Sequence, residues 1–386
     1  MIILFTILGL LFLLVSPKLF LFIYIIIRYA SNVKSIKVLS IFDFLVFFYF
    51  SLTMAIMVAN RPYYIGKEIG FGEDMLHYYN AFDWVSNTSF IDFFKDFSMV
   101  TTLTGSSEPL FWLVVKVITI FFQDGYYIHV LITLIGCFLI YLAGQYWHKC
   151  GLLFLFLYSN TITFFAFQGS AIRSGLALGF AIFGYVLFFR KKNKFAHLLS
   201  PLVHYSMIPV PVIPYLADFN FKDIKKLLKL LVTIVLFTFL FIFFSMRSID
   251  SGLGAKVTAR LSENELDFSS IIQFFVESLV FISLILTVFK NKVEKFLKVS
   301  LILFFLMSVV LLLLSPTAFS RFYRYEYIFF ILIYSSIFFR SSNEFRVLLI
   351  SISLLWFVFI GFDRFVGVFA ENILDFIGYN LIYRFN

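Results

Sequence analysis

Long apolar runs recur along the whole chain and restrict the folds that are open to it. A run of about 18 residues or more with few charges is long enough to cross a lipid bilayer as a helix. Only 14% of the residues are charged, compared with about 25% in soluble globular domains. The sequence therefore predicts an all-α, polytopic integral membrane protein with about 11–12 hydrophobic helical segments. These segments cover roughly residues 2–27, 38–59, 109–123, 127–146, 151–167, 171–189, 195–217, 228–245, 270–289, 298–315, 325–339 and 346–362.

The apolar segments follow one another without an internal repeat, so residues 1–386 are expected to form a single integral membrane domain. The first apolar run has no basic segment before it and no small-residue cleavage site after it, which favours a retained first span. The two cysteines, Cys137 and Cys150, are too few for a disulfide framework or a cysteine-rich metal site.

Positively charged links between the apolar segments predict how the chain is oriented. Lys and Arg are enriched in the cytoplasmic loops of membrane proteins. The net charge of +9 fits this bias and does not indicate nucleic-acid binding. The polar loops 60–108 and 246–269 are expected at the outer face. The basic links, expected inside, are Arg28–Lys37, Arg190–Lys194, Lys222–Lys229, Lys290–Lys298 and Arg340–Arg346.

This orientation requires two apolar segments that enter the membrane without crossing it. Segment 109–123 is short and contains Lys116, whose side chain is expected to snorkel to the surface. Segment 195–217 contains four prolines, which a regular helix of that length does not tolerate. A broken or re-entrant element of this kind is stable in a membrane where it lines a cavity or is buried in protein. With both adjustments, every basic link faces the cytoplasm.

Arg173 is the only formal charge between Gly151 and Phe189. A cation at the centre of a spanning helix costs about 2.5–3.5 kcal/mol on insertion scales. The predicted orientation places segment 168–173 at the outer surface instead, where this cost falls. A guanidinium at headgroup depth can bind the diphosphate of a lipid carrier, because its planar fork matches the phosphate oxygens.

Other polar residues are expected at the same face. Asp74, Glu108 and His204 are candidates for accepting a proton from a sugar hydroxyl, although His204 joins the group only if a cavity reaches down to it. Each residue also has a structural alternative: Glu108 before Pro109 suits a helix cap, and His204 suits helix packing. Arg321 and Arg324 could instead anchor the chain at the membrane interface. Candidate contacts to a diphosphate or a sugar are Gln168, Tyr78, Tyr323, Arg260, Arg321 and Arg324.

Five pieces of the sequence occur in the order of a known family. Taken together, the stretch from about residue 70 to 330 resembles the EpsG-type family, which are bacterial exopolysaccharide and O-antigen repeat-unit polymerases of the Wzy class. The pieces are GEDMLHYY (72–79), EPLF (108–111), QGSAIRSGLA (168–177), LVHYS (202–206) and SRFYRY (320–325).

The resemblance implies an enzyme that joins oligosaccharide repeat units at the outer face of the bacterial cytoplasmic (inner) membrane. The growing chain would leave its undecaprenyl diphosphate carrier for the non-reducing end of a second lipid-linked unit. The product would be O-antigen of lipopolysaccharide or another surface polysaccharide. The implied enzyme is a metal-independent glycosyltransferase without a cofactor, and its expected partners are the lipid-linked oligosaccharide, membrane lipid and a chain-length regulator protein.

The resemblance also implies roles for individual residues. Arg173 and one of Arg321 or Arg324 would hold the diphosphate and stabilise the charge that grows on it as the glycosidic bond breaks. The general base stays open among three candidates, which are Asp74, Glu108 and His204.

Two other functions use similar residues. A flippase or transporter of lipid-linked sugar needs its cations along a path through the membrane, whereas the cations expected here gather near one face. An O-antigen ligase typically has a large loop between late spans, whereas the largest polar loop of this chain, 60–108, is early. The sequence favours a polymerase over both.

Overall fold

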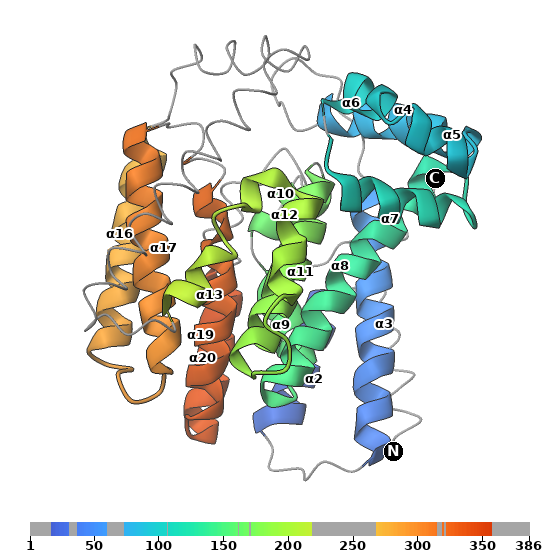
Figure 1. The fold of residues 1–386 in the computed structure, drawn as a ribbon. Helices are drawn as coiled ribbons and strands as arrows, with labels where there is room; N and C mark the ends of the chain where they lie inside the picture. The colour runs from blue at the N-terminus through green and yellow to red at the C-terminus, as the bar shows by residue number, and fades with distance from the viewer. Residues whose placement is uncertain are drawn as a thin grey trace.

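The computed structural model of the chain is built from helices, without a strand in the part that it describes. Four of the helices are long and apolar enough to cross a membrane: α3 (Lys37–Ala59), α8 (Gly125–His148), α11 (Ile172–Phe189) and α17 (Lys295–Leu314). The predicted all-α polytopic membrane fold is thereby confirmed (Figure 1). The described residues are 17–30, 37–59, 73–105, 107–160, 162–169, 171–217, 268–314, 319 and 322–356.

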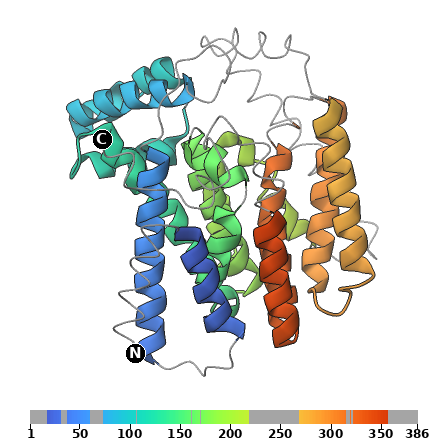
Figure 2. The same cartoon turned by 180° about the vertical axis from the view of Figure 1, so that it is seen from behind.

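Helices α8 and α11 form the centre of the bundle. They pack closely because glycines face each other: a Cβ atom added at Gly179 would lie 3.0 Å from the carbonyl oxygen of Gly136. Small residues that allow close backbone contact are typical of helix interfaces in membranes. Around this pair lie α3, α9 (Gly151–Ser159) and shorter helices (Figures 1 and 2). The latter are α2 (Pro17–Ile25), the π-helix η1 (Ile26–Ala30), α19 (Tyr327–Phe339) and α20 (Asn343–Trp356), whereas α16 (Phe268–Leu286) packs against α17 at the side of the bundle.

Four of the five predicted basic links lie at one end of the bundle, which we call the basic end (Figures 1 and 2). Two of them contact each other, because Arg340 pairs with Glu294 and Lys292 donates to the Ser341 hydroxyl at 3.0 Å. In a third, Arg28 pairs with the Asp43 carboxylate at 3.2 Å. The link 222–229 lies outside the described residues.

The opposite end is covered by four short helices that lie across the bundle (Figure 1). Three of them fall in the segment expected as a polar loop at the outer face, 60–108, so the described part of this loop is helical. The fourth, α7, has 11 residues and is about 16 Å long, which is too short to cross a bilayer core of about 30 Å. The four helices are α4 (Glu73–Asn87), α5 (Phe90–Lys95), α6 (Ser98–Thr104) and α7 (Pro109–Thr119).

Lys116 does not snorkel to the surface, contrary to the expectation. It is buried, and its ammonium donates hydrogen bonds to the carbonyl oxygens of Val85, at 2.7 Å, and Thr88. These carbonyls lie at the C-terminal end of α4, where no further amide of the helix reaches them. Lys116 therefore fastens α4 to α7 and offsets the negative end of the α4 dipole.

The segment predicted as one helix, 151–167, is broken into α9 and α10 (Ile162–Gly169). The first helix, α9, ends at the polar residues Ser159 and Asn160. The short helix α10 contacts the start of α11 at the end of the bundle opposite the basic end (Figure 1).

Segment 195–217 is a broken hairpin, as its prolines predicted. Its two ends meet near the basic end, where the Tyr215 hydroxyl donates to the Lys194 carbonyl at 2.7 Å. Its tip is His204, which reaches the opposite end. The Tyr185 hydroxyl of α11 donates to the Val210 carbonyl at 2.5 Å, beside the Ile213 amide at 3.2 Å, since Pro214 has no amide to donate. Its short pieces are η2 (Ala196–Leu199), α12 (Ser200–Val203), η3 (Tyr205–Met207) and α13 (Val212–Ala217).

Gly184 sets the distance between α11 and this hairpin. A Cβ atom at position 184 would overlap the backbone of His197, which cannot move aside as a flexible side chain does. We expect Gly184→Ala to destabilise the protein by about 1–3 kcal/mol, the usual cost of overpacking. Thermal unfolding of the purified protein in detergent measures this. Gly179→Ala, with its nearest neighbour at 3.0 Å, should lower the melting temperature less. Equal melting of Gly184→Ala and wild type would contradict the described packing.

Candidate functional site

Glu108 binds the side chains of two predicted site residues from distant parts of the chain. One carboxylate oxygen accepts a hydrogen bond from Arg173 Nη1 at 2.7 Å, and the other lies 3.0 Å from His204 Nδ1. Glu108 is the N-cap residue of α7 and precedes Pro109, but its side chain does not cap the helix. With 3% of its surface exposed, the carboxylate is shielded from water, which strengthens both interactions.

Arg173 lies in the first turn of α11, where a cation is disfavoured by the positive end of the helix dipole. The ion pair with Glu108 offsets this cost. Arg173 Nε also donates to the Tyr78 hydroxyl, and the guanidinium carbon lies 5.3 Å from the centre of the Tyr78 ring. The Arg173 side chain keeps 17% of its surface exposed. It is therefore fixed in position and still reachable by a ligand.

His204 was expected to join the group only through a cavity, but it contacts Glu108 directly. Its backbone is extended (φ −154°, ψ 118°), which turns the chain at the tip of the hairpin. The next residue, Tyr205, donates its hydroxyl to the Ser107 carbonyl at 3.0 Å. Two consecutive hairpin residues thus bind two consecutive residues before α7, and this fixes the position of the imidazole.

The turn before α19, which contains the late arginines, lies beside the tip of the hairpin at His204. It contains η5 (Tyr323–Glu326), and the Tyr325 hydroxyl is 2.6 Å from the Ser206 hydroxyl. Arg324, the preceding residue, is partly exposed and makes no ion pair with any residue that the structure describes. Tyr323 packs its ring against Phe274 and Phe319 instead. The turn therefore brings Arg324 into the neighbourhood of His204.

A second polar network supports the cluster, and sequence reasoning missed most of it. The Gln168 carbonyl lies 2.6 Å from His129 Nε2, and the Tyr79 hydroxyl lies 3.4 Å from the other ring nitrogen. Gln168 was expected to contact substrate, but it is fully buried and donates to the Tyr158 hydroxyl at 2.9 Å. Its amide fills the space beside Gly175, which favours a packing role. A histidine in an otherwise apolar helix was the available signal.

The remaining predicted site residues fall into two groups. The Tyr78 ring is buried among aromatic side chains, so its hydroxyl holds Arg173 and its ring does not face a sugar. Asp74 is the second residue of α4, but its side chain lies outside the described residues, as do Arg260 and Arg321. The structure thus joins Arg173, Glu108, His204 and Tyr78, while their functional roles stay predictions.

Comparison with known proteins agrees with the five ordered sequence pieces. The model of the EpsG family matches residues 63–380, which is most of the chain. The chain belongs to the EpsG family. The matched region includes every residue of the Arg173 cluster and the late turn. The predicted resemblance is therefore confirmed.

Two curated relatives of this EpsG-family chain are named "EPS I polysaccharide export inner membrane protein EpsF". The protein from Ralstonia nicotianae is 26% identical over 330 residues, which cover 79% of this chain and 77% of the relative. The protein from Ralstonia solanacearum is 28% identical over the same shares of both chains. No solved structure matches significantly. The family and its relatives support a role in polysaccharide biosynthesis at the bacterial inner membrane.

Proposed function

We propose that this EpsG-family protein polymerises lipid-linked oligosaccharide repeat units at the outer face of the cytoplasmic membrane. The observation that supports this most strongly is the contact between Arg173, Glu108 and His204. It combines a cation for a diphosphate with a group that can accept a proton. The cluster lies at the opposite end from the basic links, which the positive-inside rule assigns to the cytoplasm.

The proposed reaction is one displacement at a sugar carbon. A hydroxyl oxygen of the acceptor unit attacks the anomeric carbon of the growing chain and forms the new glycosidic bond. The bond between that carbon and the phosphate oxygen breaks, and undecaprenyl diphosphate leaves with the electron pair. The hydroxyl proton passes to the general base. The protein must therefore stabilise negative charge on the diphosphate and accept one proton.

Arg173 would bind the diphosphate. Its Nε and Nη1 are held by Tyr78 and Glu108, while Nη2 makes no hydrogen bond to a described residue. One arginine whose charge is partly neutralised by Glu108 is not enough for a diphosphate, so a second cation is needed. Arg324 in the adjacent turn, or Arg321 before it, would supply that charge without a metal ion.

His204 is the general base that the geometry favours. If its Nδ1–H donates to Glu108, the other ring nitrogen carries the lone pair that accepts a proton. The carboxylate then orients the imidazole and stabilises the imidazolium that forms, as in other carboxylate–histidine pairs. Glu108 or Asp74 acting directly as the base is the alternative.

A deletion strain tests the proposed function. Glycan from the strain is separated on gels, and lipid-linked intermediates are extracted and sized. A polymerase predicts single repeat units on the carrier and on the final acceptor, with no ladder of longer chains. Restoration of the ladder by the plasmid-borne gene is the control. Long polymer that stays on the carrier would indicate a ligase and contradict the proposal.

A flippase is the second candidate, because the relatives are named as export proteins. It differs from a polymerase in the side of the membrane on which the lipid-linked unit accumulates. In the deletion strain, a polymerase predicts that a glycosidase added outside spheroplasts digests the accumulated unit. Protection of that unit until the cells are lysed would favour the flippase.

A further inference from the structure

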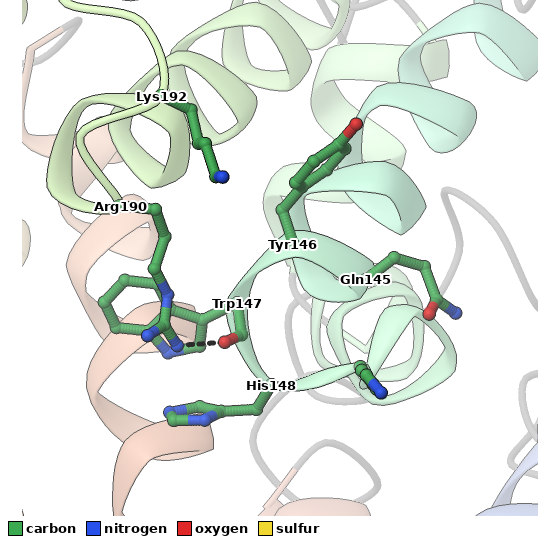
Figure 3. A pocket seen from close by; sticks show the side chains of 7 residues that line it. Gln145, Tyr146, Trp147, His148, Arg190 and Lys192 are labelled. Atoms are coloured by element: carbon green, nitrogen blue, oxygen red, sulfur yellow. Dashed lines mark hydrogen bonds between the residues drawn. The ribbon is translucent and has the colours of Figure 1, made fainter. Parts of the chain in front are cut away.

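An open hollow of about 490 Å³ lies at the basic end, far from the Arg173 cluster (Figure 3). It is formed where α8 and α11 end. Three of its lining residues carry a positive charge, and no Asp or Glu lines it. The residues that matter are Tyr146, Trp147, His148, Lys149, Arg190 and Lys192.

Arg190 and Trp147 form the fixed wall of this hollow. Arg190 Nη2 donates to the Trp147 carbonyl, and its guanidinium carbon lies 4.7 Å from the centre of the Trp147 ring. The indole nitrogen of Trp147 in turn donates to the Ser336 hydroxyl on α19 at 3.3 Å. The charge of Arg190 is therefore held in one place. Because the side chain is already ordered, binding an anion costs less conformational entropy.

His148 adds an unsatisfied polar atom. Its ring stacks on Phe339, with ring centres 5.4 Å apart, and is thereby fixed. Its Nε2 atom is buried and has no hydrogen-bond partner in the described part of the chain. The fixed His148 ring therefore forms part of the wall of the hollow.

Two of the three positive charges that line the hollow are at helix C-termini. Lys149 and Arg190 are the C-cap residues of α8 and α11, where cations are favoured. Lys192 lies beyond the end of α11, and Figure 3 shows its ammonium pointing into the space between Arg190 and Tyr146. Lys192 belongs to the turn that ends α11, since its amide donates to the Leu187 carbonyl at 2.9 Å, and its ammonium adds a third positive charge to the hollow.

The surroundings favour a ligand that has an apolar part. Tyr146 is half exposed, and its ring lies 6.0 Å from the Phe183 ring on α11. Tyr and Trp are typical of the level at which headgroups and acyl chains meet. Basic pockets between spanning helices on the cytoplasmic side are suited to anionic headgroups. A soluble phosphate would use the cations but not the aromatic surface.

We propose that this hollow binds the phosphate of an anionic phospholipid from the cytoplasmic leaflet. Arg190, Lys192 and Lys149 contact the phosphate oxygens, and the acyl chains lie over Tyr146 and Phe183. The site is separate from the proposed polymerisation, so either proposal can fail without the other. The bound lipid would join the ends of α8 and α11, the two helices at the centre of the bundle.

The proposed lipid site is tested by measuring lipid binding to the purified full-length protein in neutral detergent. Native mass spectrometry follows titration with 1-palmitoyl-2-oleoyl-phosphatidylglycerol, and with the phosphatidylcholine that has the same chains. K149Q/K192Q should bind phosphatidylglycerol about 30-fold more weakly than wild type, from two surface cations. K191Q/K194Q is the matched control, because it removes the same charge from the same region outside the hollow. K149R/K192R keeps both charges and should retain binding. Retained binding would show that substitutions at positions 149 and 192 do not prevent folding.

The other outcomes overturn the proposal. Equal loss of binding in K191Q/K194Q would show diffuse attraction to surface charge. Equal binding of phosphatidylcholine would show that the phosphate charge is not recognised. Displacement of phosphatidylglycerol by the same concentration of inorganic phosphate would identify a soluble anion as the ligand.

Discussion

Replacing Arg173 with alanine is expected to abolish the ladder of long polymer and leave single repeat units. On the proposed function, the guanidinium stabilises negative charge that develops on the leaving diphosphate. Loss of one such preorganised donor lowers turnover by at least about 100-fold, and loss of a full charge lowers it further. Gel analysis of the glycan measures the ladder, and immunoblotting of membranes measures the protein.

A structural explanation for this loss must be separated from a functional one. Alanine at position 173 leaves Glu108 buried without its cation, and breaking a buried ion pair costs about 3–5 kcal/mol. In R173Q/E108Q the two neutral amides can bond each other, so protein levels should recover, which would show that any loss of protein in Arg173→Ala comes from the unpaired carboxylate. Arg28→Ala is the matched control, since Arg28 also pairs with a shielded carboxylate, Asp43, but at the basic end. Long polymer in Arg173→Ala at normal protein levels would falsify the assignment.

Replacing His204 with glutamine is expected to have the second-largest effect. Glutamine can still donate to Glu108, so the tip of the hairpin should keep its position. It cannot accept a proton, and loss of a general base lowers turnover by about 10²–10⁴-fold. The residual activity of the variant should lose the acid limb of the pH–rate profile. Polymerisation by membranes with added lipid-linked repeat units provides that profile.

His197→Gln is the control for this variant. His197 belongs to the same hairpin but lies near its base, where its ring packs 5.1 Å from Tyr215 and 5.2 Å from Phe188. We expect it to lower protein stability and to leave the pH–rate profile of the surviving enzyme unchanged. An unchanged acid limb in His204→Gln would assign the proton transfer to Glu108 or Asp74 instead.

The sequence predicted the features that depend on local chemistry. Apolar length identified the four long helices of the described chain, and four prolines identified the broken hairpin, because proline removes a helix hydrogen bond wherever it stands. Arg173 and His204 were predicted as site residues because polar groups are costly in apolar segments. Glu108 was predicted from its place in a polar loop. The contact among them was not predictable, since it depends on how far the hairpin tip reaches.

The errors concern residues whose partners are distant in the chain. Lys116 was expected at the surface, but carbonyls at the end of α4 bind it in the interior. Gln168 was expected at a sugar, but glycines on α8 and α11 leave room for its side chain to be buried. Helices α4 to α6 were missed because an amphipathic helix in a polar segment has a weak apolar signal. In each case, the decisive contact joins helices that the sequence separates.

The ion pair of Glu108 and Arg173 also follows the order in which the chain is made. Glu108 precedes Arg173 by 65 residues and His204 follows it. When α11 reaches the membrane insertion machinery, the carboxylate has already been synthesised, whereas the histidine has not. The cost of inserting the guanidinium can then be offset during biogenesis by a carboxylate already at the membrane surface. The two residues of the ion pair are thus both synthesised before the histidine that completes the group.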